Sequence, residues 1–594
     1  MTSHELIPES RHRQLDEGAD RSWAGRRGGR RAREAAIVGG PALVAMYMGY
    51  RQRWVGDDGL IYSRTVRQLL AGHGPVFNLG ERAEASTGTL WQWLIAGAAY
   101  LCGRDPSVVA VTLGILLTGA GYIAVMAAAR SAVRPLSAAP LLPLGILILL
   151  PVKADWDYAS SGLENGLSTG WIGCSWWLLV RARPPAAGSA RSRRPGGYAA
   201  AFVIGLGPLV RPDLALVGAV FLGALWWLLR PPPGRTLLML GAAAGLPAAY
   251  EVFRAGYYGV LVPLPALTKE ASQAVWSRGF AYFGNFAGPY WLWVPLTLLA
   301  ALAVLVPRRT ALRPELLAPP VAGLLSWLYV CRVGGDFMHG RLLVPGLLLL
   351  VMPLCAVPLS RPVIAVAGAL AAWAVCCALL WRPVASSGNP YLILDEQRDY
   401  VGYTGDPHPI TEATHGRRRK PLRPALRAAE EAGRPVLLMQ IPGGRNGFAS
   451  LPLAHRFGAR TAASYDLLGY NGVVTPLADA SVDPLGLAYP LAAHQARTAR
   501  RTAGRSGHEK PLDPAWIIAD YTDPGAALPP GLDPARVRAA RHALTCGPLA
   551  ELQSSVRAPL TPSRFLRNAL GAWTRTVFRY PDDPVEAERT LCRR

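Results

Sequence analysis

Residues 56–91 read GDDGLIYSRTVRQLLAGHGPVFNLGERAEASTGTLW, and they follow shortly after the first long hydrophobic run of the chain, 35–50. The adjacent carboxylates Asp57 and Asp58 therefore stand where the chain leaves that run. Between residues 61 and 72 the apolar side chains fall on one helical face and the arginines on the other, which predicts an amphipathic helix lying along the membrane plane. Such a helix would hold both carboxylates where lipid headgroups meet water.

Composition extends this interpretation to most of the chain. Of the 594 residues, 51% are hydrophobic and only 17% are charged, and apolar runs of about the length of a bilayer core recur. The sequence predicts a polytopic α-helical membrane protein with about eleven transmembrane helices. The runs predicted to span are 35–50, 107–129, 136–151, 162–180, 197–210, 214–229, 236–253, 290–306, 316–331, 342–358 and 362–381.

A twelfth apolar run, 89–102, is assigned by the distribution of positive charge. Arginines cluster in 26–33 and 181–194, and basic loops stay in the cytoplasm. An even number of crossings must then separate Asp58 from Ser161, because the next run, 162–180, leads into the second cluster. One of the three runs between Asp58 and Ser161, which are 89–102, 107–129 and 136–151, therefore does not span. The shortest is 89–102, which we interpret as an interfacial helix in one long outer loop, 51–106. Eleven crossings place the paired aspartates and the C-terminus outside the plasma membrane.

Three regions follow from this pattern. Residues 1–34 are arginine-rich and predict a disordered cytoplasmic tail, and 35–382 form the transmembrane domain. Residues 383–594 lack a spanning run and predict a soluble extracytoplasmic domain of mixed α/β character. Within it, 421–441 indicates a helix followed by a strand, and PAWIIADY at 514–521 indicates a strand.

The net charge and the cysteine positions limit which ligands and cross-links the chain can have. The net charge of +23 would suit nucleic acid, but the predicted topology puts the arginines in cytoplasmic loops and in the outer domain, so we expect contact with anionic membrane lipids and no nucleic acid. Six of the eight cysteines lie in or beside the apolar runs, and their spacing matches no metal site. Cys546 and Cys592 belong to the outer domain, where oxidising conditions permit the disulfide that we predict.

The paired aspartates indicate chemistry. One carboxylate could simply cap the helix that follows it, which explains one aspartate better than two. A carboxylate at this depth can take a proton from a sugar hydroxyl that attacks an activated carbon. We place Asp57 first and Asp58 second as the catalytic base, and a role as nucleophile in a double displacement stays open.

Further motifs carry a resemblance to a known family. They are SSGLENGL (160–167), LVRPDLAL (209–216), YYGVLVPLPALTKEAS (257–272), VGGDFMHGRLLVPGL (333–347), VDPLGLAYPLAAH (482–494) and GRSGHEKPLDPAWIIADY (504–521). Together with 57–91, they resemble the GT-C glycosyltransferases and, within them, the actinobacterial terminal β-(1→2)-arabinofuranosyltransferases. The resemblance covers nearly the whole chain after the N-terminal tail.

The resemblance implies a GT-C fold and transfer of arabinofuranose from a polyprenyl (decaprenyl) phosphate to a cell-envelope arabinan. Charges at the outer ends of the apolar runs suggest one shared polar cavity. A phosphate leaving group gains negative charge, so it needs fixed cations. The candidates for the donor phosphate are Lys269, Arg341, His339 and Arg211. The candidates for sugar hydroxyls are Glu164, Asp213, Asp336 and Glu81, of which Glu164 and Asp213 could instead form structural pairs.

Several alternatives stay open. Another lipid-linked sugar such as mannose would suit the same motifs, and the sequence departs from the family pattern at Ala85, Gly88 and Leu264, which we expect in the donor pocket. A transporter of lipid-linked sugars would show an internal repeat, and none is evident. We expect no obligatory cofactor or metal, because phosphate is already a competent leaving group.

Overall fold

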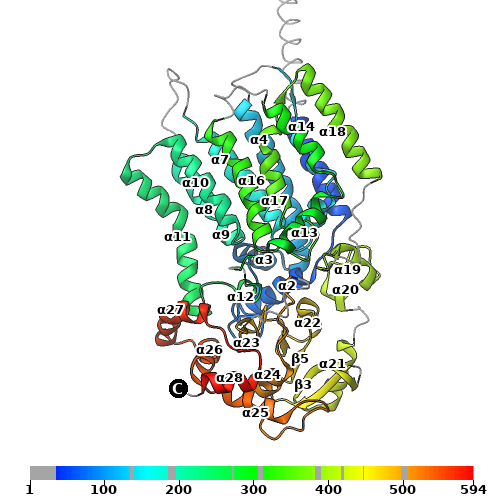
Figure 1. Ribbon diagram of the computed structural model, residues 1–594, viewed down its shortest axis with the longest axis vertical. Helices are drawn as coiled ribbons and strands as arrows, with labels where there is room; N and C mark the ends of the chain where they lie inside the picture. Colours follow the sequence, from blue (N-terminus) through cyan, green and yellow to red (C-terminus); the bar gives the residue numbers. More distant parts are fainter. Residues whose placement is uncertain are drawn as a thin grey trace, which may run out of the picture.

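A computed structural model describes residues 35–133, 139–184, 196–270, 273–304, 312–380, 390–416, 421–445, 447–496 and 506–592. The predicted cytoplasmic tail, 1–34, lies outside the described residues. Figure 1 shows two parts, a bundle of long helices and a smaller C-terminal part packed against one end of it. The boundary expected near residue 383 falls within 381–389, which lie outside the described residues.

The first part is a bundle of apolar helices that run roughly side by side (Figure 1). Four described helices are long and apolar enough to cross a membrane, α4, α11, α16 and α18, and shorter apolar helices accompany them. The bundle comprises 35–51, α4 (Pro106–Val133), α7 (Asn165–Arg181), α8 (Gly196–Gly205), α9 (Gly207–Val210), α10 (Leu214–Leu229), α11 (Pro233–Tyr257), α14 (Trp293–Val304), α16 (Pro314–Arg332), α17 (Val344–Val351), η1 (Met352–Leu354) and α18 (Arg361–Leu379).

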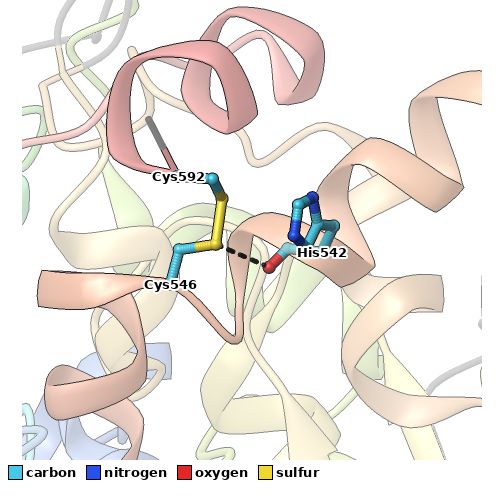
Figure 2. Close-up of side chains that lie close together, drawn as sticks. All are labelled: His542, Cys546 and Cys592. Atoms are coloured by element: carbon cyan, nitrogen blue, oxygen red, sulfur yellow. Dashed lines mark hydrogen bonds between the residues drawn. A yellow bond between two sulfur atoms is a disulfide. The ribbon is translucent and has the colours of Figure 1, made fainter. Parts of the chain in front are cut away.

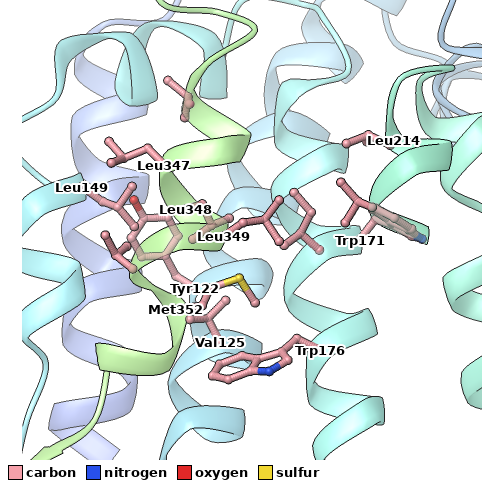
Figure 3. Packing of buried hydrophobic residues seen from close by; sticks show 14 of the residues in the cluster. Tyr122, Val125, Leu149, Trp171, Trp176, Leu214, Leu347, Leu348, Leu349 and Met352 are labelled. Carbon is pink, nitrogen blue, oxygen red and sulfur yellow. The ribbon is translucent and has the colours of Figure 1, made fainter. Parts of the chain in front are cut away.

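Glycines let α4 and α7 approach closely. A Cβ atom added at Gly166 would lie 2.2 Å from the carbonyl oxygen of Gly114, and one at Gly173 would lie 2.5 Å from that of Gly121. Small residues permit such backbone contact between membrane helices. Large side chains fill the core beside this contact, including Trp176 (Figure 3). The two helices therefore pack with their backbones in contact, and the turn before α7 lies at the end of this pair.

The expectation of one spanning helix over 136–151 is wrong. Its described part begins with β1 (Leu141–Leu142), which pairs antiparallel with β2 (Val357–Pro358), and continues as the six-residue α5 (Leu144–Leu149). Prolines cause the breaks, because Pro140, Pro143 and Pro151 supply no backbone N–H to a helix. The helix α6 (Lys153–Ala159) follows.

Shorter helices lie where the bundle meets the C-terminal part (Figure 1). They are α2 (Asp57–Leu70), α3 (Thr89–Cys102), α12 (Leu264–Thr268) and α13 (Trp276–Ala287). α3 ends at Gly103 in the left-handed conformation and exposes Tyr100 and Leu101. This helix thus lies at the end of the bundle, beside the C-terminal part (Figure 1).

The arginine face of α2 is packed against protein and does not lie in water. Arg64 is fully buried, and its guanidinium donates hydrogen bonds to the carbonyl oxygens of Thr475 (2.7 Å), Asp479 (2.8 Å) and Gly472 (2.9 Å). These acceptors belong to the C-terminal domain. α2 is therefore held between the bundle and that domain. The guanidinium of Arg64 donates its hydrogen bonds to backbone carbonyl oxygens and not to water.

The C-terminal domain is of mixed α/β character, as predicted. Its sheet has the order β4-β3-β5-β6, with β4 antiparallel to β3 and the other neighbours parallel. The strands are β3 (Val436–Arg445), β4 (Phe448–Pro452), β5 (Thr461–Ser464) and β6 (Ala480–Val482). The helices are α19 (Glu396–Thr404), α20 (Glu412–Gly416), α21 (Leu422–Ala432), α22 (Leu468–Val474), α23 (Pro490–Ala493), α24 (Pro514–Tyr521), α25 (Pro534–Ala543), α26 (Gly547–Arg557), α27 (Pro562–Val577) and α28 (Pro584–Leu591).

Two local expectations have opposite outcomes. The helix and strand expected over 421–441 are present as α21 and β3. PAWIIADY, expected as a strand, is the buried helix α24. The side chain of Asp513 caps its first turn by accepting from the N–H of Ala515, and Pro514 occupies the first helical position, where its missing N–H costs nothing.

The predicted disulfide between Cys546 and Cys592 is present, and it joins the residue before α26 to the residue after α28 (Figure 2). These two cysteines with His542 form the one group among the described residues with the spacing of a metal site. Because both sulfurs are bonded to each other, they are not available as thiolate ligands.

We predict that Arg64→Ala destabilises the protein, because several buried carbonyl oxygens of the C-terminal domain lose their donor. The cost should be about 3 kcal/mol, measured as a lower Tm of the purified protein in detergent. Arg538→Ala, which removes an exposed arginine of α25, is the control and should leave the Tm unchanged. Equal Tm values for the two variants would contradict this role.

Candidate active site

A cavity of about 180 Å³ lies between the bundle and the C-terminal domain. Asp58 and Tyr62 of α2 line it, together with side chains from the turns at the ends of α9 and α16 and with Leu487 of the C-terminal domain. The charged residues in its wall are Asp58, Arg211, Asp213, Lys269, Asp336 and Arg341. The structure therefore brings together, around one cavity, six of the charged residues that the sequence analysis singled out.

Arg341 is the centre of the charged cluster. Its guanidinium lies 3.0 Å from Glu164, 3.4 Å from Asp336 and 3.6 Å from Asp58. Burial disfavours its positive charge, but the three carboxylates outweigh burial and raise its pKa above the usual range. Arg341 is thus a fixed cation that three acidic side chains hold in one orientation.

Two more cations border the same cavity. Arg211 Nε lies 2.6 Å from Asp213, and Arg211 Nη1 lies 3.9 Å from Glu164 and makes no hydrogen bond. Lys269 Nζ has a looser partner, Asp336, at 3.8 Å, and its side chain is 32% exposed. These two side chains therefore retain hydrogen-bonding capacity for an anion.

The two aspartates have different environments. The carboxylate of Asp57 accepts hydrogen bonds from the backbone N–H groups of Gly469 (2.8 Å) and Tyr470 (2.9 Å) at the start of α22. Only glycine fits at position 469, because a Cβ there would lie 2.0 Å from the carbonyl oxygen of Asp57. Asp57 therefore docks the C-terminal domain onto α2, whereas Asp58 faces the charged cavity.

A second, smaller cavity of about 20 Å³ adjoins the first. Asp58, Lys269, Leu487 and Ser506 border both cavities. The rest of its wall comes mostly from the C-terminal domain and is made by Asp57, Phe337, Asp466, Leu467, Leu468, Leu485, Gly507 and His508. Asp58 thus stands between a cation-rich cavity and one walled by the C-terminal domain.

His339 does not belong to the phosphate-binding group that the sequence suggested. Its Nδ1 lies 2.7 Å from the side-chain oxygen of Asn285, and its ring packs beside Phe286 and Tyr290, away from both cavities. Burial lowers its pKa to about 4, so the ring is neutral at pH 7. A neutral imidazole behind the wall supplies no charge to a phosphate.

Glu81 is also misassigned as a sugar ligand. Its carboxylate lies 2.9 Å from Arg557 of α26, and Arg557 also binds Asp520 at 2.7 Å. Burial raises the pKa of Glu81, although the neighbouring guanidinium opposes that shift. This buried network joins the loop before α3 to the C-terminal domain, and Glu81 lines neither cavity.

Sequence reasoning missed Tyr62. Its hydroxyl donates to Glu164 (3.1 Å) and accepts from the backbone N–H of Gly88 (2.8 Å). The signal was its spacing of four residues from Asp58, which places both on one side of α2. A Cβ at Gly88 would lie 2.5 Å from this hydroxyl, so glycine at this position leaves room for the bond. Ala85 lines the cavity as expected, and Leu264 does not.

Known proteins resemble the chain over most of its length. Residues 458–585 match the family model described as the AftB family C-terminal domain. The terminal β-(1→2)-arabinofuranosyltransferase of Mycobacterium tuberculosis is 35% identical, over 91% of this chain and 94% of the relative. The enzyme with the same name from Corynebacterium glutamicum is 34% identical, over 91% and 84%.

Among solved structures, ArnT from Cupriavidus metallidurans bound to undecaprenyl phosphate covers 67% of this chain and 72% of its own, at 18% identity and a TM-score of 0.41. That likeness is weak, and the family assignment rests on the two relatives and on the family model. They confirm the resemblance that the motifs suggested. The chain is a membrane glycosyltransferase that belongs to the family of terminal β-(1→2)-arabinofuranosyltransferases.

Proposed function

We propose that this protein transfers arabinofuranose from a polyprenyl phosphate, such as decaprenyl phosphate, to the end of a cell-envelope arabinan. The observation that supports this most directly is the position of Asp58, between a cavity with three cations and a second cavity walled by the C-terminal domain. The family membership supplies the sugar, and the charged cavity suits a phosphate leaving group.

The three cations fit the donor side of this reaction. As the sugar–phosphate bond breaks, the electron pair stays on the phosphate oxygen, and positive charge aimed at that oxygen lowers the barrier. Arg341 is already fixed by its three carboxylates, so it needs no reorganisation. Lys269 and Arg211 Nη1 have looser partners and can turn toward the phosphate.

The carboxylates around these cations act through them. Asp213 binds Arg211 through both of its oxygens, at 2.6 and 2.8 Å. Glu164 is fully buried and holds Arg341 and Tyr62. We therefore propose that Asp213 and Glu164 position the cations and do not bind sugar hydroxyls. Asp336 lies between Arg341 and Lys269, where it could position these cations or bind a sugar hydroxyl.

Asp58 is the proposed catalytic carboxylate. As a base, it would take the proton of the acceptor hydroxyl while the hydroxyl oxygen bonds to the anomeric carbon and the phosphate leaves. As a nucleophile, it would first bond to that carbon while the phosphate leaves. In a second step the acceptor hydroxyl would displace the carboxylate, which would take up the hydroxyl proton. Its place between the cavities suits both paths, which differ in the configuration of the product.

We also propose eleven crossings in a GT-C arrangement, with the cavity and the C-terminal domain outside the plasma membrane. The segments 139–152 and 342–358 each contain a broken helix, and β1 and β2 pair them at one end. At the other end, Lys153 contacts Asp395 and Arg341 lines the cavity. The segment 139–152 thus runs toward the cavity and 342–358 runs away from it, so each connects the two ends of the bundle, which supports one crossing for each.

Asp58→Asn should reduce transfer by about 10²- to 10⁴-fold, because the variant can neither accept a proton nor act as a nucleophile. The measurement is transfer by the purified protein from a polyprenyl-phospho-arabinose to an arabinose oligosaccharide. Asp57→Asn, the matched control, keeps one of two acceptors for the N–H groups of α22 and should lose less activity and lower the Tm. Undiminished transfer by the Asp58 variant would overturn the proposed site. No transfer by the unmodified protein would point to another sugar, such as mannose.

Lys269→Gln should lower kcat by about 10²-fold, because one cation that stabilises the leaving phosphate is removed. Lys269→Arg should recover part of the rate, since it keeps the charge. Steady-state kinetics with the same donor would measure both variants. His339→Gln is the control behind the cavity wall, and a loss as large as that of Lys269→Gln would contradict the assignment of the phosphate site.

Chelation by EDTA should leave transfer measurable, because side-chain cations already supply positive charge at the proposed phosphate site. Transfer is compared before and after dialysis against the chelator, and again after addition of Mg²⁺ or Mn²⁺. Complete loss that a divalent ion restores would show an obligatory metal and contradict this expectation.

A further inference from the structure

Four large apolar side chains of α27 are exposed on one face of the helix. They are Leu566 (62% exposed), Leu570 (87%), Trp573 (67%) and Val577 (56%). Their spacing of four, three and four residues forms a single helical stripe. The described residues from 390 onward contain four other exposed large apolar side chains, Leu392, Tyr403, Leu560 and Val585. None of those four lies on α27, so half of this exposed apolar surface is concentrated on one helix.

The opposite face of α27 is fixed to the end of a membrane helix. Asn568 donates a hydrogen bond to the carbonyl oxygen of Gly256 (3.1 Å), and Arg575 donates to that of Gly259 (2.8 Å). Phe565 packs so closely on Gly256 that no Cβ fits there. α27 therefore lies directly at the last turn of α11, as Figure 1 shows.

The length of α11 places that last turn at the bilayer surface. Its 25 residues extend about 37 Å, which exceeds the roughly 30 Å thickness of the hydrocarbon core. Its side chains Leu238, Leu246 and Val252 are exposed, as expected for a helix that faces lipid. The apolar stripe of α27 thus lies next to the end of a helix with an exposed apolar surface.

The composition of the stripe fits the same partner. Tryptophan is enriched where headgroups meet acyl chains, and Trp573 lies within the stripe. Arg567 is exposed next to Leu566, where a long cationic side chain can reach a lipid phosphate. A helix with this pattern lies in the interface plane with its apolar side chains among the lipids.

We propose that α27 is an interfacial anchor that binds outer-leaflet lipid through Leu566, Leu570, Trp573 and Val577. The anchor holds the C-terminal domain on the bilayer surface beside α11. The choice of leaflet rests on the proposed topology, whereas the lipid contact itself stands whether or not the proposed sugar transfer is correct.

Photo-crosslinking of the full-length protein in lipid nanodiscs tests the anchor. The photoreactive residue p-benzoylphenylalanine is introduced at Leu570 and, as the control, at Val585, an exposed apolar residue of α28. Intact mass spectrometry after irradiation should show lipid adducts many-fold more abundant for position 570 than for position 585. Equal yields would overturn the proposal, and so would crosslinks from position 570 to a second copy of the chain.

A double variant provides a second measurement. Leu570→Glu with Trp573→Glu should increase hydrogen exchange of the α27 backbone in nanodiscs several-fold, because the charged helix leaves the lipid and frays. Val585→Glu is the control and should leave exchange of α27 unchanged. Unaltered exchange in the double variant would show that lipid does not hold this helix.

Discussion

The buried guanidinium of Arg341 binds together three segments that are far apart in the sequence. Glu164 comes from the turn before α7, Asp336 from the turn after α16 and Asp58 from α2. A charge buried at the end of an apolar bundle is costly unless opposite charges surround it. The cluster therefore stays together in one arrangement, and that arrangement defines the cavity.

The C-terminal domain completes this site as a second wall. Asp57 binds the start of α22, Arg64 binds carbonyl oxygens beyond its end, and Arg557 bridges Glu81 and Asp520. All three contacts use charged side chains on backbone groups or on opposite charges, with little exposure to water. Such charge-assisted contacts fix orientation more strictly than apolar packing does, which explains how a separate domain can line a cavity as small as this one.

Hydropathy and charge made much of this predictable. The long runs, the change of character near residue 383, the short helix over 89–102 and the cavity residues Asp58, Lys269 and Arg341 all follow from local patterns. The interruption of 136–151 could also have been predicted, because Pro140 and Pro143 precede α5 and Pro151 follows it. The family pattern contributed the sugar and the lipid phosphate, which the residues alone do not specify.

Other assignments depended on partners hundreds of residues away. Asp57 and Asp58 are adjacent and chemically identical, so their sequence gives no reason to separate a docking residue from a catalytic one; the backbone N–H groups of Gly469 and Tyr470 make that distinction. The motifs that contain His339 and Glu81 suggested that both residues belong to the site. In the folded chain His339 contacts Asn285 and Glu81 pairs with Arg557, and neither residue lines either cavity of the site. Hydrophobic periodicity and charge specify which segments enter the membrane, because each residue contributes to that free energy independently. Pairing of buried polar groups is a property of the packed chain, and it alone selected which carboxylate faces the cavity.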